Sequence, residues 1–345
     1  MSFKLLSSIM LGLRYNSAFQ KLLKSLRAVP VLAMLWVLCG CAADKPTLHY
    51  PYIIAAEQFS TSFLVLNPNV DPCSREAIVW RYNPAVHWDF DDKYLRKFRN
   101  PSEAKIVENG SKLLFTCSGG ACGLIDLATE KLDWLVFAGG NPHSAEILPD
   151  GNAVTASSIG SHLMLWDLKK DIKGSVSKKY MLPSAHGVVW DPQTQLIYAC
   201  GKHGIVSYKY DPEKVELTQV RIYNLDRKDI AAYAHDLLLD PCDGKLLVTV
   251  TRGLVKVDQI SGAFEVITPQ RYLKSASISP AAGTLVMMAT RRYWSDELHK
   301  VDEQGRIVDF IRLPHMQFYK ARWISDNENM WIKNKQADLK ADKHE

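Results

Sequence analysis

The chain has 345 residues, 47% of them hydrophobic and 23% charged, and its formal net charge is +5. This composition excludes a chain that is disordered throughout and allows a large hydrophobic core. The positive charge would favour an anionic partner, but the excess lies within the first 40 residues, which contain no acid and carry Lys4, Arg14, Lys21, Lys24 and Arg27. The remainder has as many basic as acidic residues, so the sequence predicts no nucleic-acid partner.

Residues 1–40 have the pattern of a secretion signal peptide. The basic segment precedes a short apolar run, VPVLAMLWVL (Val29 to Leu38), and small residues follow. This run has about half the length that a membrane-spanning helix needs, so the sequence predicts export; an uncleaved N-terminal anchor is the alternative. LCGC (Leu38 to Cys41) resembles the lipobox of bacterial lipoproteins, which implies a lipid on Cys41. By analogy with such lipoproteins, Ala42 after the lipidated cysteine implies the outer membrane, with the periplasmic or surface face left open.

The rest of the chain is built from a repeat of 39 to 49 residues. Each complete unit has one apolar run before a turn and one after it, then a run that ends near an acidic residue, then a more variable run. Short β-branched and aromatic runs between turn residues are typical of antiparallel strands. Four strands per unit predict an all-β fold, the β-propeller. The units begin at Ser102, His143, His186, His235, Lys274 and Lys320.

The two ends of the repeat region predict how the propeller closes. The segment from Tyr52 to Pro68, with AIVWRYNP after it, matches the last three strands of a unit, and KARWISD near the C-terminus matches a first strand. Pairing these ends would leave no open sheet edge. We therefore expect six blades of four antiparallel strands in a single domain over residues 51–335, after a linker at 41–50 and before a polar tail at 336–345. Seven blades is the alternative, if NMWIKNK forms a separate blade with part of residues 85–100.

Two segments carry a resemblance to known propellers. HGVVWDP (His186 to Pro192) and PDGN (Pro149 to Asn152) resemble the six-bladed NHL-like and YncE-like propellers, and especially an uncharacterised family of bacterial exported propeller proteins. The resemblance covers nearly all of residues 50–335. It implies architecture rather than chemistry, because propellers serve as enzymes, binding proteins and scaffolds alike.

The residue at the start of each unit predicts a polar ring. The first strand of a propeller blade lines the central channel, so the residue just before it lies at one channel mouth. Five of the six residues at this place are basic: Ser102, His143, His186, His235, Lys274 and Lys320. We predict that this ring binds a small anionic or carbohydrate-like ligand or a protein partner, with charge from lysine and directional hydrogen bonds from histidine. A purely structural ring is one alternative, and an envelope scaffold without a ligand site is another.

The three histidines also suggest a metal site. Neutral imidazoles bind divalent transition metals such as zinc or manganese, and three of them would leave coordination positions open for water or substrate. The candidate ligands are His143, His186 and His235. No other cofactor is indicated by a sequence motif.

A weak, fold-level resemblance to oligogalacturonate lyases and related propeller enzymes gives the enzyme alternative. Those proteins have a histidine-based site at the propeller axis, which implies metal-assisted β-elimination on a uronate polysaccharide. By this resemblance the carboxylate would be neutralised by Lys274, Lys320 and Arg322, and Tyr233 or Tyr272 would serve as acid.

Other polar residues are expected to have structural roles. The acids just past the ring could join the site, but we expect them to face solvent: Glu103, Glu146 and Asp236. His162 and His203 are expected in exposed turns. The recurrent acids after the third strands should cap turns: Asp126, Asp167, Asp211, Asp258 and Asp302.

Cys117 and Cys122 flank the Gly-rich turn of CSGGAC. If this turn places them opposite each other across a hairpin, they would form a disulfide in an oxidising compartment. No second Cys/His pair at zinc-ligand spacing accompanies them.

Overall fold

The computed structural model describes residues 52–87, 91–225 and 233–324. The predicted signal peptide at 1–40, the lipidated Cys41, the linker at 41–50, the segment NMWIKNK and the tail at 336–345 lie outside these residues. Within the described part of the chain, no helix is long and apolar enough to cross a membrane.

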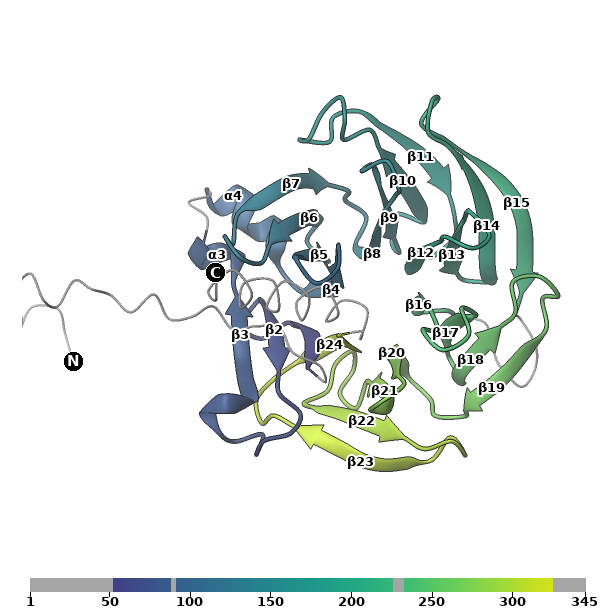
Figure 1. Cartoon of the computed structure of the whole chain (residues 1–345). Helices are drawn as coiled ribbons and strands as arrows, with labels where there is room; N and C mark the ends of the chain where they lie inside the picture. The colour runs from purple at the N-terminus through teal and green to yellow at the C-terminus, as the bar shows by residue number, and fades with distance from the viewer. Residues whose placement is uncertain (1–51, 88–90, 226–232, 325–345) are drawn as a thin grey trace, which may run out of the picture. The chain divides into compact units, whose positions relative to one another are not determined.

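The described residues form six four-stranded antiparallel sheets around a ring, which confirms the six-bladed β-propeller (Figure 1). The innermost strands are β4 (Pro101–Val107), β8 (Pro142–Ile147), β12 (Gly187–Asp191), β16 (Asp236–Leu239), β20 (Leu273–Ser279) and β24 (Phe318–Trp323). The second strands are β5 (Lys112–Cys117), β9 (Ala153–Ser157), β13 (Leu196–Gly201), β17 (Leu246–Val250), β21 (Gly283–Met288) and β1 (Ile53–Glu57). We name each blade by its innermost strand.

The outer half of each blade has the same order. The third strands are β6 (Ala121–Asp126), β10 (His162–Trp166), β14 (Gly204–Asp211), β18 (Gly253–Val257), β22 (Glu297–Val301) and β2 (Ser62–Leu66). The outermost strands are β7 (Leu132–Phe137), β11 (Ser177–Met181), β15 (Glu216–Asn224), β19 (Phe264–Thr268), β23 (Ile307–Arg312) and β3 (Ile78–Tyr82). One short helical segment, η3 (Arg75–Ala77), precedes β3, and three lie between β3 and β4: α3 (Pro84–His87), α4 (Asp92–Leu95) and η4 (Arg96–Phe98).

The ring closes as predicted, because the C-terminal strand β24 pairs with β1 in the β24 blade. The two strands are antiparallel, with Ala55 opposite Ala321. The seven-blade alternative would use part of residues 85–100 as strands, but the described residues there include α3, α4 and η4 and no strand.

Neighbouring blades cover both faces of each sheet. Between the β8 and β12 blades, for example, Leu163 and Leu165 belong to one buried cluster with Val188 and Ile197. All five residues of β9 are buried, as is expected for a strand that is covered on both sides. This explains why the inner strands read as continuous apolar runs and not as an alternation of apolar and polar residues.

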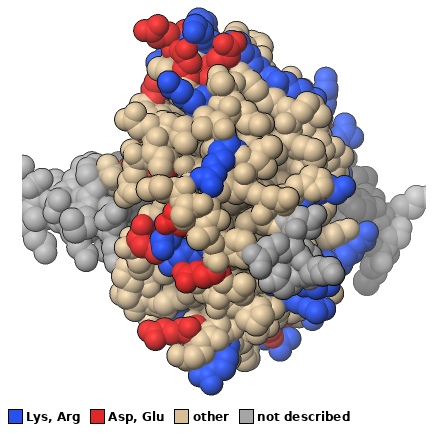
Figure 2. Space-filling view, turned by 90° about the vertical axis from the view of Figure 1, so that its right-hand side faces the viewer, with Lys and Arg blue, Asp and Glu red and all other residues tan. Residues whose placement is uncertain are grey.

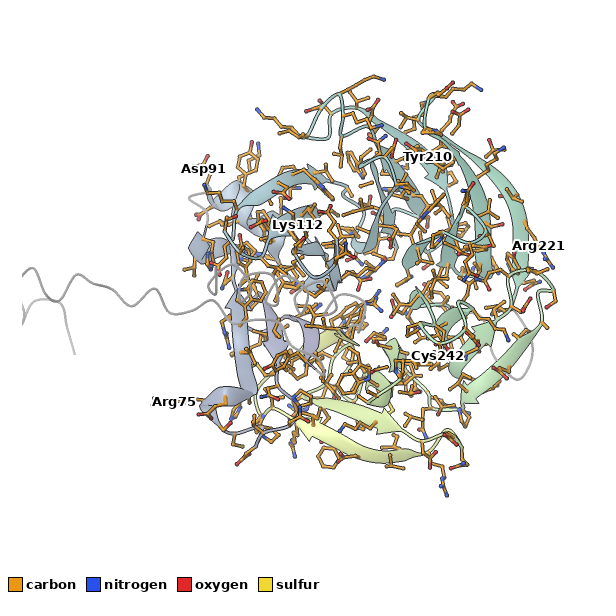
Figure 3. The ribbon with its side chains drawn as sticks, in the orientation of Figure 1. Arg75, Asp91, Lys112, Tyr210, Arg221 and Cys242 are labelled. Carbon is orange, nitrogen blue, oxygen red and sulfur yellow. The ribbon has the colours of Figure 1, made fainter. Side chains whose placement is uncertain are left out.

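The outermost strands form the rim of the ring and have one open face. Val220 and Ile222 of β15 and Val266 of β19 are exposed there. Arg221, which lies on this rim in Figure 3, donates hydrogen bonds to the carbonyl oxygens of Ile260 (2.7 Å) and Ser261 (3.1 Å) in the next blade. The rim seen in Figure 2 carries basic and acidic side chains interspersed among uncharged ones.

The recurrent acids mostly cap turns, as predicted. Asp126 accepts a hydrogen bond from the backbone N–H of Thr129 at 2.7 Å, and Asp258 accepts one from Ser261 at 2.8 Å. Asp211 and Asp302 accept bonds from the turns that follow them in the same way. Asp167 differs, because its buried carboxylate forms an ion pair with Lys170 at 2.8 Å.

The predicted disulfide is absent, and both cysteines are free, buried thiols. The strand register pairs Cys122 with Thr116 and not with Cys117. The two side chains therefore enter different cores, Cys117 beside Phe115 and Cys122 beside Trp134.

We expect these two thiols to resist alkylation in the folded protein. Burial raises the pKa of the Cys117 and Cys122 thiols, so little thiolate is available, and both side chains are shielded. Iodoacetamide followed by mass spectrometry should modify the exposed Cys73 and Cys242 first, and the buried pair only in denaturant. If Cys117 and Cys122 remained unmodified in denaturant and became modified only after reductant was added, they would form a disulfide instead.

Candidate ligand-binding site

A cavity of about 500 Å³ lies at one mouth of the channel. We call it the His/Lys cavity, and all six blades contribute to its lining. The residues are Gln58, Asn100, Ser118, Asn141, His143, Ser158, Ile159, Ser184, His186, Tyr233, His235, Lys274, Tyr293 and Tyr319. Four of the six ring residues predicted from the repeat are therefore brought together here, and two are not.

β-Bulges place the ring residues at the mouth. The pairing of the innermost with the second strand skips Ser102 in β4, His143 in β8 and Lys274 in β20. In β24 the skipped residue is Tyr319, because Phe318 and Lys320 pair with consecutive residues of β1. A bulge re-aims a side chain. The sixth member of the ring is thus Tyr319, and the assignment of Lys320 was wrong by one position.

The chain enters several innermost strands through a left-handed residue. Asn100, Asn141, Ser184 and Tyr272 each lie two residues before a ring position and have φ between 53° and 65°. Such a conformation costs a non-glycine residue about 1–3 kcal/mol and is concentrated at functional sites. Asn100, Asn141 and Ser184 line the His/Lys cavity, whereas Tyr272 does not. Tyr272 is 61% exposed, so the structure does not place it where the predicted acid would act.

The three histidines form a row of aromatic contacts. The rings of His143 and His186 stack with centroids 4.8 Å apart and planes 6° apart, and the ring of His235 meets His186 edge-on at 5.0 Å. Tyr319 stacks on the other side of His143 at 5.2 Å. His143 thus stacks on two neighbouring rings, from the β12 and β24 blades.

Hydrogen bonds fix the tautomers of two of these rings. Nδ1 of His186 donates to the carbonyl oxygen of Ser184 at 2.8 Å, so Nε2 of the neutral ring is an acceptor. Nε2 of His143 accepts from Nδ2 of Asn141 at 3.0 Å, so Nδ1 of that ring carries the proton. This Nδ1 is buried without a hydrogen-bond partner among the described residues, as is Nδ1 of His235.

All three imidazoles are neutral at physiological pH. Burial lowers the pKa of His186 to about 4. Burial lowers the pKa values of His143 and His235 well below the ordinary value. Repulsion from nearby positive charges, such as those of Lys274 and Lys320, lowers them further. The cationic ring expected from the sequence is therefore a ring of neutral imidazoles with a single lysine.

The histidines do not form the metal ligand set that the sequence suggested. Two parallel rings in a stack cannot direct their nitrogens to one point between them. Among the residues that the structure describes, no group of three or more His, Cys, Asp or Glu side chains is arranged to hold a metal ion. The site predicted for zinc or manganese at His143, His186 and His235 thus does not fit their arrangement.

Lys274 provides the positive charge of the His/Lys cavity. Its ammonium has no hydrogen-bond acceptor and no ion-pair partner among the described residues, and it lies 6.0 Å from the ring centroid of Tyr293. Burial, and to a lesser degree the charge of Lys320, lowers the pKa of Lys274 to about 8. An uncompensated lysine of this kind marks a candidate functional group.

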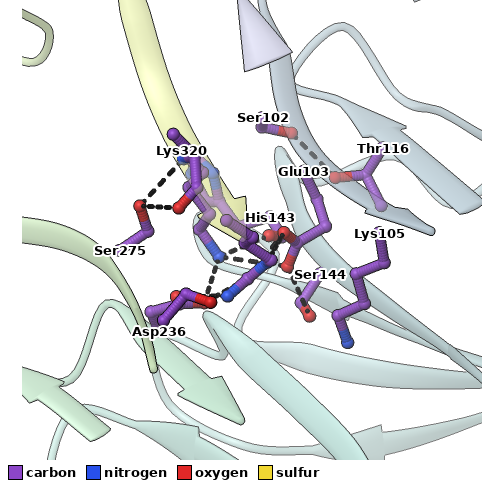
Figure 4. A network of polar contacts seen from close by, with 12 residues as sticks. Ser102, Glu103, Lys105, Thr116, His143, Ser144, Asp236, Ser275 and Lys320 are labelled. Atoms are coloured by element: carbon purple, nitrogen blue, oxygen red, sulfur yellow. Dashed lines mark hydrogen bonds and ion pairs between the residues drawn. The ribbon is translucent and has the colours of Figure 1, made fainter. Parts of the chain in front are cut away.

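Lys320 lies beneath the cavity in a buried ion network (Figure 4). Its Nζ contacts Asp236 at 2.9 Å, Glu103 at 3.3 Å and the carbonyl oxygen of His143 at 2.9 Å. Arg322 bonds the same two carboxylates, at 2.6 Å to Glu103 and 2.7 Å to Asp236. Lys320 and Arg322 are therefore neutralised within the protein and are not available to neutralise a ligand.

The expectation that the acids past the ring face solvent was wrong. Glu103 and Asp236 belong to the buried network, and Glu146 pairs with Lys105 at 2.8 Å. Lys105, Glu146 and Arg322 line a second cavity, of about 320 Å³, whose other walls are mostly apolar. The network thus lies between the His/Lys cavity and this second cavity in the channel.

The remaining predicted residues have other surroundings. The hydroxyl of Ser102 is buried, donating to the carbonyl oxygen of Pro142 at 2.6 Å, so this residue joins two blades and does not line the cavity. Tyr233 lines the cavity and accepts a hydrogen bond from Ser184 at 2.8 Å. His203 is exposed as expected, but His162 is buried, with Nδ1 2.9 Å from the carbonyl oxygen of Gly160.

Sequence analysis missed Tyr319, Tyr293 and Asn141 as lining residues. Asn141 could have been predicted, because it lies two residues before a ring histidine and asparagine tolerates the left-handed conformation found there. Tyr319 is adjacent to the lysine that the repeat singled out. Nothing in the repeat indicates Tyr293, which lies in the connection between β21 and β22.

Two solved structures resemble parts of this chain. A protein of unknown function from Bacteroides caccae has a similar structure, with a TM-score of 0.52 and 13% identity, covering 79% of this chain and 98% of that one. The β-propeller domain of Cps50 (Swd1) from Myceliophteria thermophila matches with a TM-score of 0.46 and 15% identity over 74% of this chain and 81% of that one. No curated protein matches the sequence. The model of a family of unknown function, DUF6528, matches residues 41–339, and the chain belongs to this family.

Proposed function

We propose that this chain is an exported, lipid-anchored β-propeller of the bacterial envelope that binds a small anionic, hydroxyl-bearing ligand in the His/Lys cavity. Export and anchoring are supported by the signal-like residues 1–40 and by LCGC before Ala42. The binding role is carried by one observation: Lys274 presents to a cavity that all six blades line an ammonium with no hydrogen-bond acceptor and no ion-pair partner among the described residues. A protein partner that inserts an acidic side chain would use the same group.

The charges in the cavity favour a ligand with one negative charge. Lys274 is the one Lys or Arg among the described lining residues, and the imidazoles beside it are neutral. A carboxylate matches this single positive charge. A phosphate dianion would keep one negative charge without a cationic partner in the cavity, which is unfavourable.

The hydrogen-bonding groups favour hydroxyls on the rest of the ligand. Nε2 of His186 is an acceptor, so it would be repelled by an anion and would bind an O–H group. Tyr233 and Tyr293 add phenolic hydroxyls that both donate and accept. A sugar acid is the simplest ligand that combines one carboxylate with several hydroxyls. The stacked imidazoles support this binding role over the metal-assisted lyase that the sequence also suggested.

We expect the affinity for D-glucuronate to depend on pH through Lys274 alone. The titratable and charged groups around this lysine are the three neutral histidines, Tyr293 and Lys320. Because the pKa of Lys274 is about 8, the ammonium persists at pH 7 and is lost as the pH rises. Affinity should therefore stay level between about pH 5.5 and 7.5 and then fall roughly tenfold per pH unit well above pH 8.

Isothermal titration with D-glucuronate, D-glucose and inorganic phosphate tests this expectation. Glucuronate should bind better than either of the others at pH 7, and Lys274→Met should remove its advantage over glucose. Lys214→Met is the matched control, because Lys214 is exposed in a turn and pairs with Asp211 away from the cavity. Affinity that rises steeply as the pH falls through 6.5 would show that the histidines carry the charge, and the proposal would fail.

A further inference from the structure

The three lysines of the channel differ in how their amines are satisfied. Nζ of Lys105 donates to two backbone carbonyl oxygens and to Glu146, at 2.8 to 3.0 Å. Nζ of Lys320 likewise bonds one carbonyl oxygen and two carboxylates. Nζ of Lys274 has no acceptor among the described residues. Lys105 and Lys320 are thus structural cations, and Lys274 is the one whose nitrogen remains available to a ligand.

We propose that Lys274 is a nucleophilic lysine that captures carbonyl compounds in the His/Lys cavity as imines. This inference rests on the proposed ligand cavity and specifies its ligand further, as one with an aldehyde or ketone group. The geometry supports it in two ways. The amine faces an open volume of about 500 Å³, and no carboxylate among the described residues holds it in the ammonium form.

The neighbours of Lys274 also favour the neutral amine. Burial disfavours its charge and Lys320 adds a second ammonium nearby, so the pKa of Lys274 falls to about 8. Lysines that act as nucleophiles are activated by burial in this way or by an adjacent cation. At pH 7.4 roughly 20% of the Lys274 side chains would be neutral, against about 0.1% for an ordinary lysine.

The reaction balances without an oxidant or a cofactor. The lone pair of Nζ attacks the carbonyl carbon, the π electrons of the C=O bond move to oxygen, and the nitrogen loses a proton while the oxygen gains one. The hydroxyl of the resulting carbinolamine takes up a proton from solvent and leaves as water when the nitrogen lone pair forms the C=N bond, which gives a protonated imine. The ring centroid of Tyr293 lies 6.0 Å from the amine, and this phenol also lines the cavity. A protonated imine keeps the positive charge in the cavity, so a carboxylate on the same ligand remains paired.

The test compares lysines within one sample. The folded protein is incubated at pH 7.4 with glycolaldehyde and sodium cyanoborohydride, which reduces imines to stable amines, and labelled peptides are quantified by mass spectrometry. We expect Lys274 to be labelled roughly tenfold faster than the exposed Lys179 and Lys214, because its larger neutral fraction outweighs the weaker nucleophilicity of a less basic amine. The preference should disappear in denaturant.

The outcomes separate this inference from the proposed function. Glycolaldehyde carries no charge, so its reaction does not depend on anion binding. If Lys274 is labelled no faster than Lys214 in the folded protein, the inference is wrong, whatever the glucuronate titration shows. If labelling is selective but glucuronate does not bind, Lys274 is a nucleophile and the proposed anion site is wrong.

Discussion

We expect Lys274→Met to stabilise the folded propeller by about 2 kcal/mol at pH 7 while it removes the anion preference of the cavity. The folded state lowers the pKa of Lys274 from its ordinary 10.5 to about 8, which means that folding disfavours the ammonium. This pKa difference corresponds to about 3 kcal/mol, and the partial exposure of the side chain reduces it. Methionine has a similar length and carries no charge to desolvate.

The pH dependence of this effect has a definite sign. Because the folded pKa lies below the unfolded one, the penalty is fully present below pH 8 and is relieved as the pH rises toward 10.5. Urea unfolding at pH 7 and at pH 10 should therefore show the stability gain of Lys274→Met shrinking at the higher pH. Lys320→Met is the contrasting variant, because it leaves Glu103 and Asp236 with one cation fewer and should destabilise the protein. Equal losses of stability in both variants would show that Lys274 is a structural lysine.

A residue that costs stability and has no partner is typical of a binding site. Natural proteins keep such groups where function needs them, and removing them commonly gains stability. Among the residues that the structure describes, the ammonium of Lys274 has no acceptor and Nδ1 of His143 has no hydrogen-bond partner, and both groups lie in the same ring. The left-handed Asn141 and Ser184 add backbone strain at the same mouth. Their concentration at one end of the channel supports a site there more strongly than any one of them would.

The blades could be predicted from the sequence because each one repeats the same local signals. Turn residues, apolar runs and the spacing of units recur in every blade, and β1 had no first strand of its own, so closure by β24 followed. The ring was located for the same reason, since His143, His186 and Lys274 occupy one place in the repeat. Its last member was misplaced because the bulge at Tyr319 shifts the register by one residue, and nothing local in KARWISD indicates that shift.

The chemistry of the channel could not be predicted, because it depends on contacts between blades that are distant in sequence. Glu103 lies more than 200 positions from Lys320, and neither side chain alone indicates that they meet at the axis. The charge of the histidines likewise depends on their burial and on the charges of residues from other blades, which the repeat does not report. A place in the repeat therefore predicts where a side chain lies and not its protonation state.

The buried network at the axis contains two positive and two negative side chains, so its net charge is zero. Glu103 and Asp236 face Lys320 and Arg322, and all four side chains are almost fully buried. The two cations hold the pKa of the Asp236 carboxyl well below its usual range. The stability from this carboxylate is therefore present above the unfolded pKa, near 4, and is lost only as the pH falls toward the depressed folded value.

We expect Arg322→Met to lower the free energy of unfolding by about 3–5 kcal/mol, because it leaves two buried carboxylates with only Lys320 between them. Glu103→Gln in the same chain restores the charge balance, so the double variant should recover part of this loss and give a coupling energy above about 1 kcal/mol in urea unfolding. Arg306→Met is the matched control: its ion pair with Asp302 is exposed, and its loss should change stability by less than about 0.5 kcal/mol. Losses from Arg322→Met and Glu103→Gln that simply add would contradict the network, since each charge would then be solvated on its own.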